Sequence, residues 1–111
     1  MKCDLSVSGE MLTAYLDGEI DHHSVKPVRE QIDAAIEQYE PKALALDFGK
    51  VSFMDSSGIG LVMGRFRNLQ RYGSQLYIFN PNAYIGKVMR LAGMDKLAKI
   101  QNDRSGKKEK K

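Results

Sequence analysis

The spacing of apolar residues changes along this chain, and that change constrains the fold more than any other feature. Apolar side chains occupy every second position over residues 5–7 and again over 12–16, with a Gly-Glu turn at 9–10 between them. A period of two is typical of strands, so this pattern predicts a β-hairpin that ends near Gly18. Over residues 25–39 the apolar positions recur every three or four residues, which predicts an amphipathic helix.

Both ends of this helix are marked in the sequence. Ser24 is a natural N-cap, and Pro27 is tolerated in the first turn because an N–H there would have no intrahelical acceptor. Pro41 cannot continue a helix, so we expect the helix to stop just before it.

The rest of the chain keeps alternating between apolar stretches and helical spacing. A second helix is expected after the Asp-Ser-Ser-Gly turn at 55–58 and should stop near Tyr72-Gly73, while a third is expected between Asn82 as its cap and Gly93 as its stop. The strands predicted here are a short buried one over 43–46 closed by Asp47-Phe48-Gly49, one over 76–79 and a last short one over 97–100.

Strands that alternate with helices indicate an α/β fold with parallel neighbours, in which functional groups gather at the carboxyl ends of the strands. Two polar turns are expected there. One is Gly-Glu-Ile-Asp-His-His-Ser over residues 18–24, and the other is Met-Asp-Ser-Ser-Gly-Ile-Gly over 54–60. If the strands before them are adjacent, the two turns share one rim of the domain.

The excess of positive charge lies at the C-terminal end. The sequence has 17 basic and 14 acidic side chains, and the final Lys-Lys-Glu-Lys-Lys run accounts for the whole difference. We therefore expect one domain over residues 1–103 and a disordered lysine-rich tail over 104–111. Nucleic-acid binding needs a broad basic surface, so no direct nucleic-acid partner is expected.

Few residues are of the kind that bind metals or form disulfides. Cys3 is the single cysteine, which excludes a disulfide framework within the chain. His22 and His23 lack the helical spacing of zinc ligands and have only Asp21 nearby, so they fit loop residues that help to cap the first helix. We expect no metal and no cofactor. The start of the chain lacks a hydrophobic signal region and no apolar run reaches membrane-spanning length, which favours a cytoplasmic protein without a membrane partner.

The serines of the second turn invite comparison with serine hydrolases, which are one alternative for this chain. The Gly-x-Ser-x-Gly pattern of a nucleophile elbow is missing, and Asp55 would repel the oxyanion that develops beside Ser56. A domain of this size also leaves little room for a substrate pocket. Catalysis is therefore not favoured, and the turn suits an anion such as a phosphate group at a helix start.

Glycines recur in the second predicted helix. Gly58, Gly60 and Gly64 do not have the spacing of a dinucleotide-binding loop. Gly60 and Gly64 are four residues apart on one face, followed by Arg67 and Arg71, and each costs a helix about 1 kcal/mol relative to alanine. They predict a smooth exposed strip for a partner. The alternative is that they allow close packing on the sheet or on a neighbouring helix.

Two segments carry a resemblance to a known family. Residues 16–24, Leu-Asp-Gly-Glu-Ile-Asp-His-His-Ser, and residues 51–65, Val-Ser-Phe-Met-Asp-Ser-Ser-Gly-Ile-Gly-Leu-Val-Met-Gly-Arg, resemble the anti-sigma factor antagonists of the STAS domain family, especially that of the sporulation sigma-factor switch. The resemblance extends to about Ile100. It implies a mixed, mainly parallel sheet of four to five strands, with the first two strands antiparallel and the helices on one side.

The resemblance also implies a phosphorylation site and a contact surface. Ser56 corresponds to the serine that accepts a phosphate, Ser57 to its structural neighbour, and Asp55 and Asp21 to residues implicated in recognition by the kinase. The full set of expected partner-binding residues is Asp21, His22, Asp55, Ser56, Ser57, Gly58, Gly60, Leu61 and Gly64.

The function that the resemblance implies is regulatory and not enzymatic. The unphosphorylated protein is expected to bind an anti-sigma factor that is itself an ATP-bound serine kinase, and so to free a sigma factor. Phosphorylation would inactivate it, and a serine phosphatase would restore it. The alternative within the family is a partner-switching or scaffold module whose kinase holds no sigma factor, and the alternative outside it is the serine hydrolase.

Overall fold

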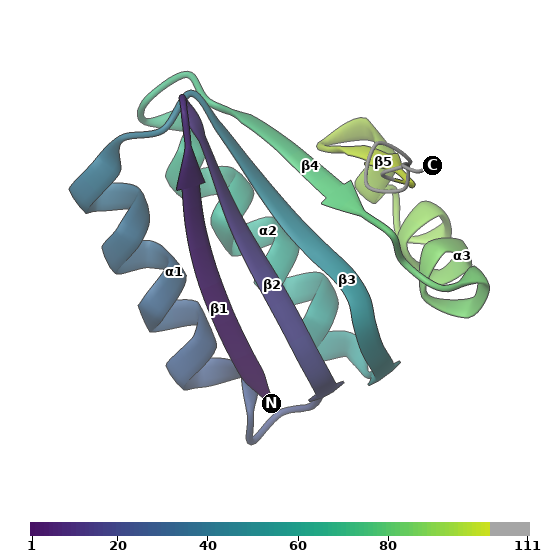
Figure 1. Cartoon of the computed structure of the whole chain (residues 1–111). Coiled ribbons are helices and arrows are strands. Elements are labelled where there is room, and N and C mark those ends of the chain that lie inside the picture. Colours follow the sequence, from purple (N-terminus) through teal and green to yellow (C-terminus); the bar gives the residue numbers. More distant parts are fainter. Residues whose placement is uncertain (103–111) are drawn as a thin grey trace, which may run out of the picture.

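The computed structural model describes residues 1–102, and the predicted lysine-rich tail over 104–111 lies outside these residues. Strands and helices alternate after an initial hairpin (Figure 1). In chain order the elements are β1 (Lys2–Ser8), β2 (Met11–Ile20), α1 (Val25–Tyr39), β3 (Ala43–Met54), α2 (Ser56–Gln70), β4 (Gln75–Phe79), α3 (Ala83–Leu91), the short 3₁₀ helix η1 (Met94–Lys96) and β5 (Lys99–Gln101).

The five strands form one sheet in the order of the sequence, β1-β2-β3-β4-β5. β1 pairs with β2 antiparallel, and every later pair is parallel. α1 and α2 lie side by side behind the sheet in Figure 1, and α3 lies beyond β4. The α/β fold with a mixed sheet and an antiparallel first pair is therefore confirmed.

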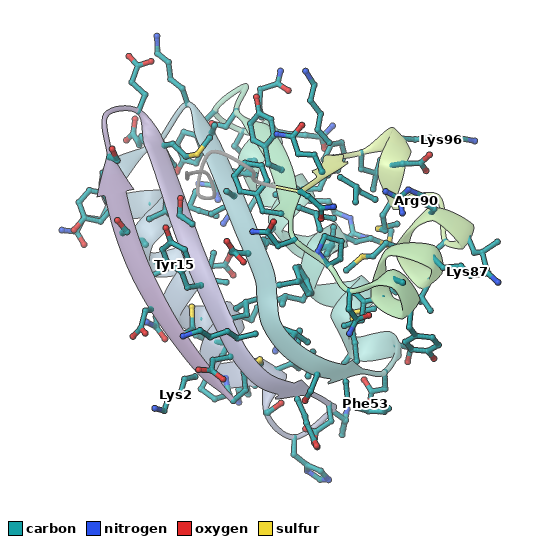
Figure 2. The ribbon with its side chains drawn as sticks, turned by 45° about the vertical axis from the view of Figure 1, so that its right-hand side comes forward. Lys2, Tyr15, Phe53, Lys87, Arg90 and Lys96 are labelled. Atoms are coloured by element: carbon teal, nitrogen blue, oxygen red, sulfur yellow. The ribbon has the colours of Figure 1, made fainter. Side chains whose placement is uncertain are left out.

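The two faces of the sheet differ in burial. On β2, Leu12, Ala14 and Leu16 are fully buried in the core under the helices, whereas Tyr15 points to the opposite face and is 49% exposed. Figure 2 looks onto this open face. Alternation of this kind is what a sheet covered by helices on one side requires. No helix within residues 1–102 is long and apolar enough to cross a membrane.

The predicted end of the third strand was wrong, because β3 runs through Asp47-Phe48-Gly49 and continues to Met54. The pairing with β2 shifts by one residue here, from Tyr15 opposite Asp47 to Asp17 opposite Lys50. The Asp47 carboxylate accepts hydrogen bonds from the Gly49 amide (2.8 Å) and from the Asn80 side chain (3.1 Å). The turn-like residues therefore form a β-bulge, and the strand carries the chain onward past the end of β4.

α1 and α3 begin where the sequence predicted, but only one of their two predicted N-caps forms a cap hydrogen bond. α1 begins at Val25 as predicted, but the Ser24 side chain makes no cap hydrogen bond. α3 is capped as predicted, since Asn82 accepts a hydrogen bond from the Ile85 amide at 2.8 Å. The last strand lies over Lys99–Gln101, slightly later than predicted, because the Leu97 and Ala98 amides hydrogen-bond back to the Met94 carbonyl of η1.

Candidate functional site

The two polar turns meet at one rim of the sheet. β2 and β3 are neighbours, Ile20 lies opposite Met54 at their carboxyl ends, and the Asp55 amide donates a 3.1 Å hydrogen bond to the Ile20 carbonyl. This confirms that the segments around Asp21 and Ser56 share a rim. The extension of β3 beyond its bulge is what brings the second turn level with the first.

Asp55 is the N-cap of α2, so the helix begins at Ser56 and includes residues that the sequence assigned to a turn. The Asp55 carboxylate accepts hydrogen bonds from the Ser57 hydroxyl and from the Ser57 amide, the latter at 2.8 Å. The Ser57 hydroxyl and amide lower the pKa of Asp55, and the His22 amide lowers it further, against opposing effects of desolvation and of the charge on Asp21. Asp55 is therefore a carboxylate at neutral pH that joins the two turns.

Asp21 organises its own turn in a similar way. Its Oδ1 accepts hydrogen bonds from the backbone amides of Ser24 (2.8 Å) and His23 (3.0 Å), and the Ser24 interaction is the largest of the causes that lower the pKa of Asp21. His22 and His23 are exposed, with their rings edge to face at 5.6 Å. Within residues 1–102, no group of three or more His, Cys, Asp or Glu side chains is placed to hold a metal ion.

The two serines differ in environment although they are adjacent. Ser57 is partly buried and its hydroxyl donates to Asp55, whereas Ser56 is exposed and its hydroxyl makes no hydrogen bond to any of residues 1–102. Ser56 occupies the first helical position of α2, where the positive end of the helix dipole favours an anionic group. No hydrogen bond within these residues joins either serine to a histidine side chain, an interaction that a serine nucleophile uses.

The glycines of α2 fall into two groups. A Cβ atom added at Gly60 or Gly64 would meet no atom outside the neighbouring helix backbone within 4 Å, which favours the exposed strip over close packing. Gly58 is buried instead, and a Cβ there would lie 2.2 Å from Cγ and 2.3 Å from Sδ of Met54. Gly58 therefore allows the first turn of α2 to pack on the end of β3.

Leu61 requires a correction among the expected partner-binding residues. Its side chain is 1% exposed and belongs to the core, together with Val62 and Leu69 of the same helix. A side chain in that position cannot contact a partner. Gly58 is likewise covered by Met54, so the outward-facing side of α2 includes the exposed Ser56 and Gly60 and the partly exposed Gly64.

These glycines allow a matched test of stability. We predict that Gly58→Ala lowers the free energy of unfolding by about 1 to 3 kcal/mol, because the new methyl group must displace the buried Met54 side chain. Gly64→Ala should instead raise it by up to about 1 kcal/mol through helix propensity. Urea denaturation of both variants measures the difference, and equal effects at the two positions would contradict this division of the glycines.

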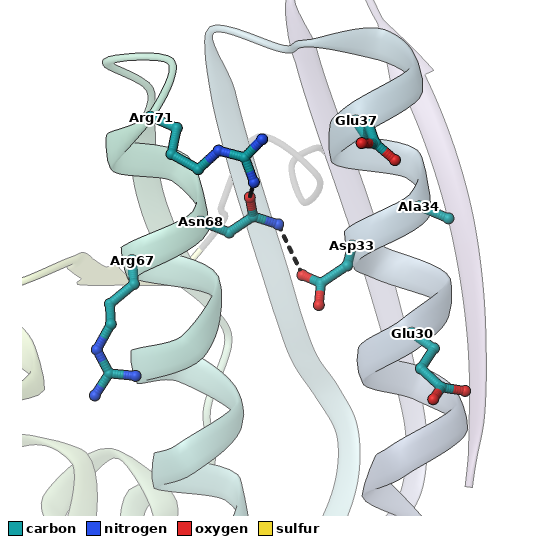
Figure 3. Close-up of a pocket in the computed structure, with 7 residues that line it drawn as sticks. All are labelled: Glu30, Asp33, Ala34, Glu37, Arg67, Asn68 and Arg71. Carbon is teal, nitrogen blue, oxygen red and sulfur yellow. Dashed lines mark hydrogen bonds between the residues drawn. The ribbon is translucent and has the colours of Figure 1, made fainter.

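A groove of about 600 Å³ runs between α1 and α2 (Figure 3). Acidic side chains line its α1 side and basic ones its α2 side. The lining residues are Glu30, Asp33, Ala34 and Glu37 of α1 and Arg67, Asn68 and Arg71 of α2. The arginines predicted to end the glycine strip therefore lie along this groove.

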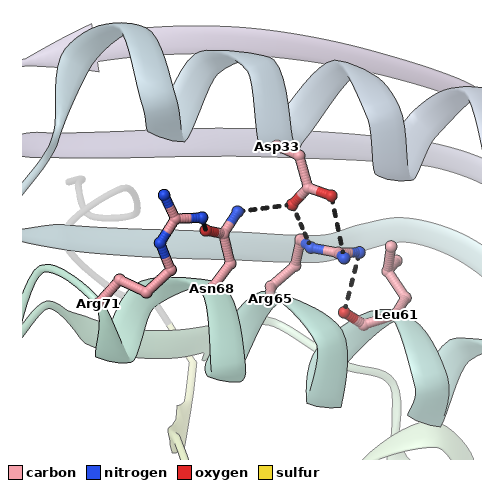
Figure 4. Close-up of polar contacts among 5 residues, drawn as sticks. All are labelled: Asp33, Leu61, Arg65, Asn68 and Arg71. Carbon is pink, nitrogen blue, oxygen red and sulfur yellow. Dashed lines mark hydrogen bonds and ion pairs between the residues drawn. The ribbon is translucent and has the colours of Figure 1, made fainter.

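Arg65 of α2 pairs with Asp33, one of the groove residues, and the sequence did not single it out. It is 4% exposed, and its guanidinium group contacts Asp33 through Nε at 2.8 Å and through a terminal nitrogen at 3.2 Å (Figure 4). The sequence contains one signal, because Arg65 lies midway between Leu61 and Leu69 in a row of residues four apart. A charged residue within an apolar row suggests a buried ion pair, but not its partner.

The comparisons with known proteins identify one family. The STAS domain model matches residues 2–106. The chain is 39% identical over 88 residues to the anti-sigma F factor antagonist of Lysinibacillus sphaericus, covering 79% of this chain and 75% of that protein.

Two solved structures are also similar. The anti-sigma factor antagonist SpoIIAA in its unphosphorylated form matches with a TM-score of 0.81 and 32% identity over 92% of this chain and 88% of that one. The phosphorylated form of SpoIIAA, described as a Bacillus cell fate determinant, matches with a TM-score of 0.74 and 33% identity over 92% of this chain and 91% of that one.

Proposed function

Because the chain belongs to the STAS domain family, we propose that it is an anti-sigma factor antagonist whose binding is controlled by phosphorylation of Ser56. In its unphosphorylated form it binds an anti-sigma factor and so frees a sigma factor. The relatives named anti-sigma F factor antagonist and the phosphorylated and unphosphorylated forms of SpoIIAA support this proposal. The protein acts in the cytoplasm by binding and not by catalysis.

The observation that carries the proposal is the difference between the two serines. The Ser57 hydroxyl is held by the N-cap carboxylate of Asp55, while the Ser56 hydroxyl is exposed and unbonded within the described part of the chain. A kinase needs an accessible hydroxyl, so Ser56 is the acceptor. The kinase is the anti-sigma factor itself with its own bound ATP, and a serine phosphatase reverses the reaction.

Phosphorylation at Ser56 would act on the interface more than on the fold. A phosphate adds a charge of about −1.5 to −2, which a partner surface that fits a hydroxyl cannot accommodate. The neighbouring carboxylate of Asp55 adds like charge, but the start of α2 stabilises an anion by roughly 0.3 to 1 kcal/mol. The folded domain therefore tolerates the phosphate that the complex does not.

Phosphate mapping tests the proposal directly. The protein is incubated with Mg-ATP and the anti-sigma F factor of Lysinibacillus sphaericus, the factor that a relative is named for antagonising. We expect one added phosphate on Ser56 by peptide fragmentation, retained in Ser57→Ala and lost in Ser56→Ala. The antagonist from Lysinibacillus sphaericus serves as the positive control for kinase activity. Phosphate on Ser57 would contradict the proposal, and so would the absence of phosphate on this protein when the control is phosphorylated under the same conditions.

A further inference from the structure

α2 has an unusual composition for a helix that a partner is expected to contact. Gly58, Gly60 and Gly64 weaken its intrinsic helix propensity, and side chains such as Ile59, Leu61 and Val62 anchor its first turns to the core. A helix of this kind depends on tertiary contacts for its conformation. Apolar contacts hold α2 on the sheet, and its exposed strip is ready for docking only if polar contacts also fix its position against α1.

Arg65 supplies such a contact from within the helix. The Arg65 guanidinium group contacts Asp33 twice. One of its terminal nitrogens also donates a 3.4 Å hydrogen bond to the carbonyl of Leu61, which lies one turn earlier in α2 and directly follows Gly60. Its Nε approaches Asp33 at 2.8 Å as an ion pair but makes no hydrogen bond with any described residue. Burial lowers the pKa of Arg65 and the charge on Asp33 raises it, and an arginine keeps its charge in such a site.

Asp33 is the point at which α1 and α2 are joined. Asn68 donates a 2.9 Å hydrogen bond to its Oδ1, and Arg71 donates to Asn68 at 3.3 Å, so a polar chain extends along α2 (Figure 4). α1 directly follows the Asp21 turn, and α2 begins at Ser56. The ion pair therefore connects the two helices that extend from the two halves of the rim.

We propose that Arg65 and Asp33 are positioning residues for partner docking, which hold the glycine-rich α2 preformed against α1 with its Ser56 end and exposed strip in place. This inference rests on the proposed function. A buried ion pair is often replaceable by apolar residues without loss of stability, so stability alone does not account for this pair. Directional hydrogen bonds fix the angle and register of two helices more narrowly than apolar packing does.

The test distinguishes an effect on the position of α2 from an effect on the stability of the whole domain. The double variant Asp33→Leu/Arg65→Met removes both charges and keeps apolar bulk, and Asp33→Asn keeps the shape and one acceptor oxygen. We expect the double variant to melt close to the unmodified protein. Its α2 amides should exchange at least about 10-fold faster, and its affinity for the Lysinibacillus sphaericus anti-sigma F factor should fall at least about 10-fold. The exchange rate and the affinity of Asp33→Asn should lie between those of the unmodified protein and those of the double variant.

Ile100→Ala in β5 is the control, since it lowers stability at the far edge of the sheet from α1. It should bind the partner normally. The inference is overturned if the α2 amides of the double variant exchange at the unmodified rate, or if its affinity loss is no larger than that of the less stable Ile100→Ala protein. Failure of the unmodified protein to bind would contradict the proposed function and the docking role together. Amide exchange in the unbound protein needs no partner, so it tests whether Arg65 and Asp33 position α2 even if the proposed function is wrong.

Discussion

Ser56→Asp is expected to weaken binding to the anti-sigma partner at least about 100-fold, since a carboxylate buried at an interface without a hydrogen-bonding or charged partner costs several kcal/mol. Ser56 is exposed at the first position of α2, where the helix dipole favours a carboxylate. The melting temperature should therefore stay within about 4 °C of the unmodified value. Titration calorimetry against the partner, beside a thermal melt, measures both quantities.

Ser56→Asn is the matched control, because asparagine has the shape of aspartate without its charge. It should retain more of the affinity than Ser56→Asp, and the difference between the two variants isolates the effect of charge. Equal affinities would show that size and not charge decides binding at Ser56. A large fall in the melting temperature of both variants would mean that the serine has a structural role.

Asp33→Ala is expected to lower the free energy of unfolding by about 2 to 3 kcal/mol, less than for a fully buried ion pair because the Asp33 side chain is 38% exposed. Arg65 is 4% exposed, so without Asp33 its charge would be buried with little compensation. Asn68 would lose its acceptor as well. Denaturant unfolding monitored by circular dichroism gives the value.

Glu37→Ala tests whether this loss belongs to the ion pair or to any acidic residue of α1. Glu37 lines the same groove one turn further along, but it is exposed and forms no ion pair with residues 1–102. Its replacement should change stability by less than about 0.5 kcal/mol. A loss below about 1 kcal/mol for Asp33→Ala would show that Arg65 finds water or another acceptor.

Several features of this protein follow from short stretches of sequence. The alternation in residues 5–16 predicted the hairpin, whose strands extend further to Lys2 and Ile20, and the helical spacing in 25–39 predicted α1 with its correct limits. Asn82 predicted the cap of α3. These features depend on neighbours within a few residues, because side-chain periodicity and capping are local interactions. The two motif segments around Asp21 and Ser56 were sufficient to indicate the family.

Other features depend on residues that are distant in the sequence. Asp47-Phe48-Gly49 has the composition of a turn, and only the pairing of β3 with β2 makes it a bulge within a longer strand. The different environments of Ser56 and Ser57 depend on where α2 begins after that strand. Arg65 is buried because Asp33, 32 residues away, lies opposite it on α1. Sequence spacing determines which face of an element a side chain occupies, whereas burial and pairing depend on what the fold packs against that face.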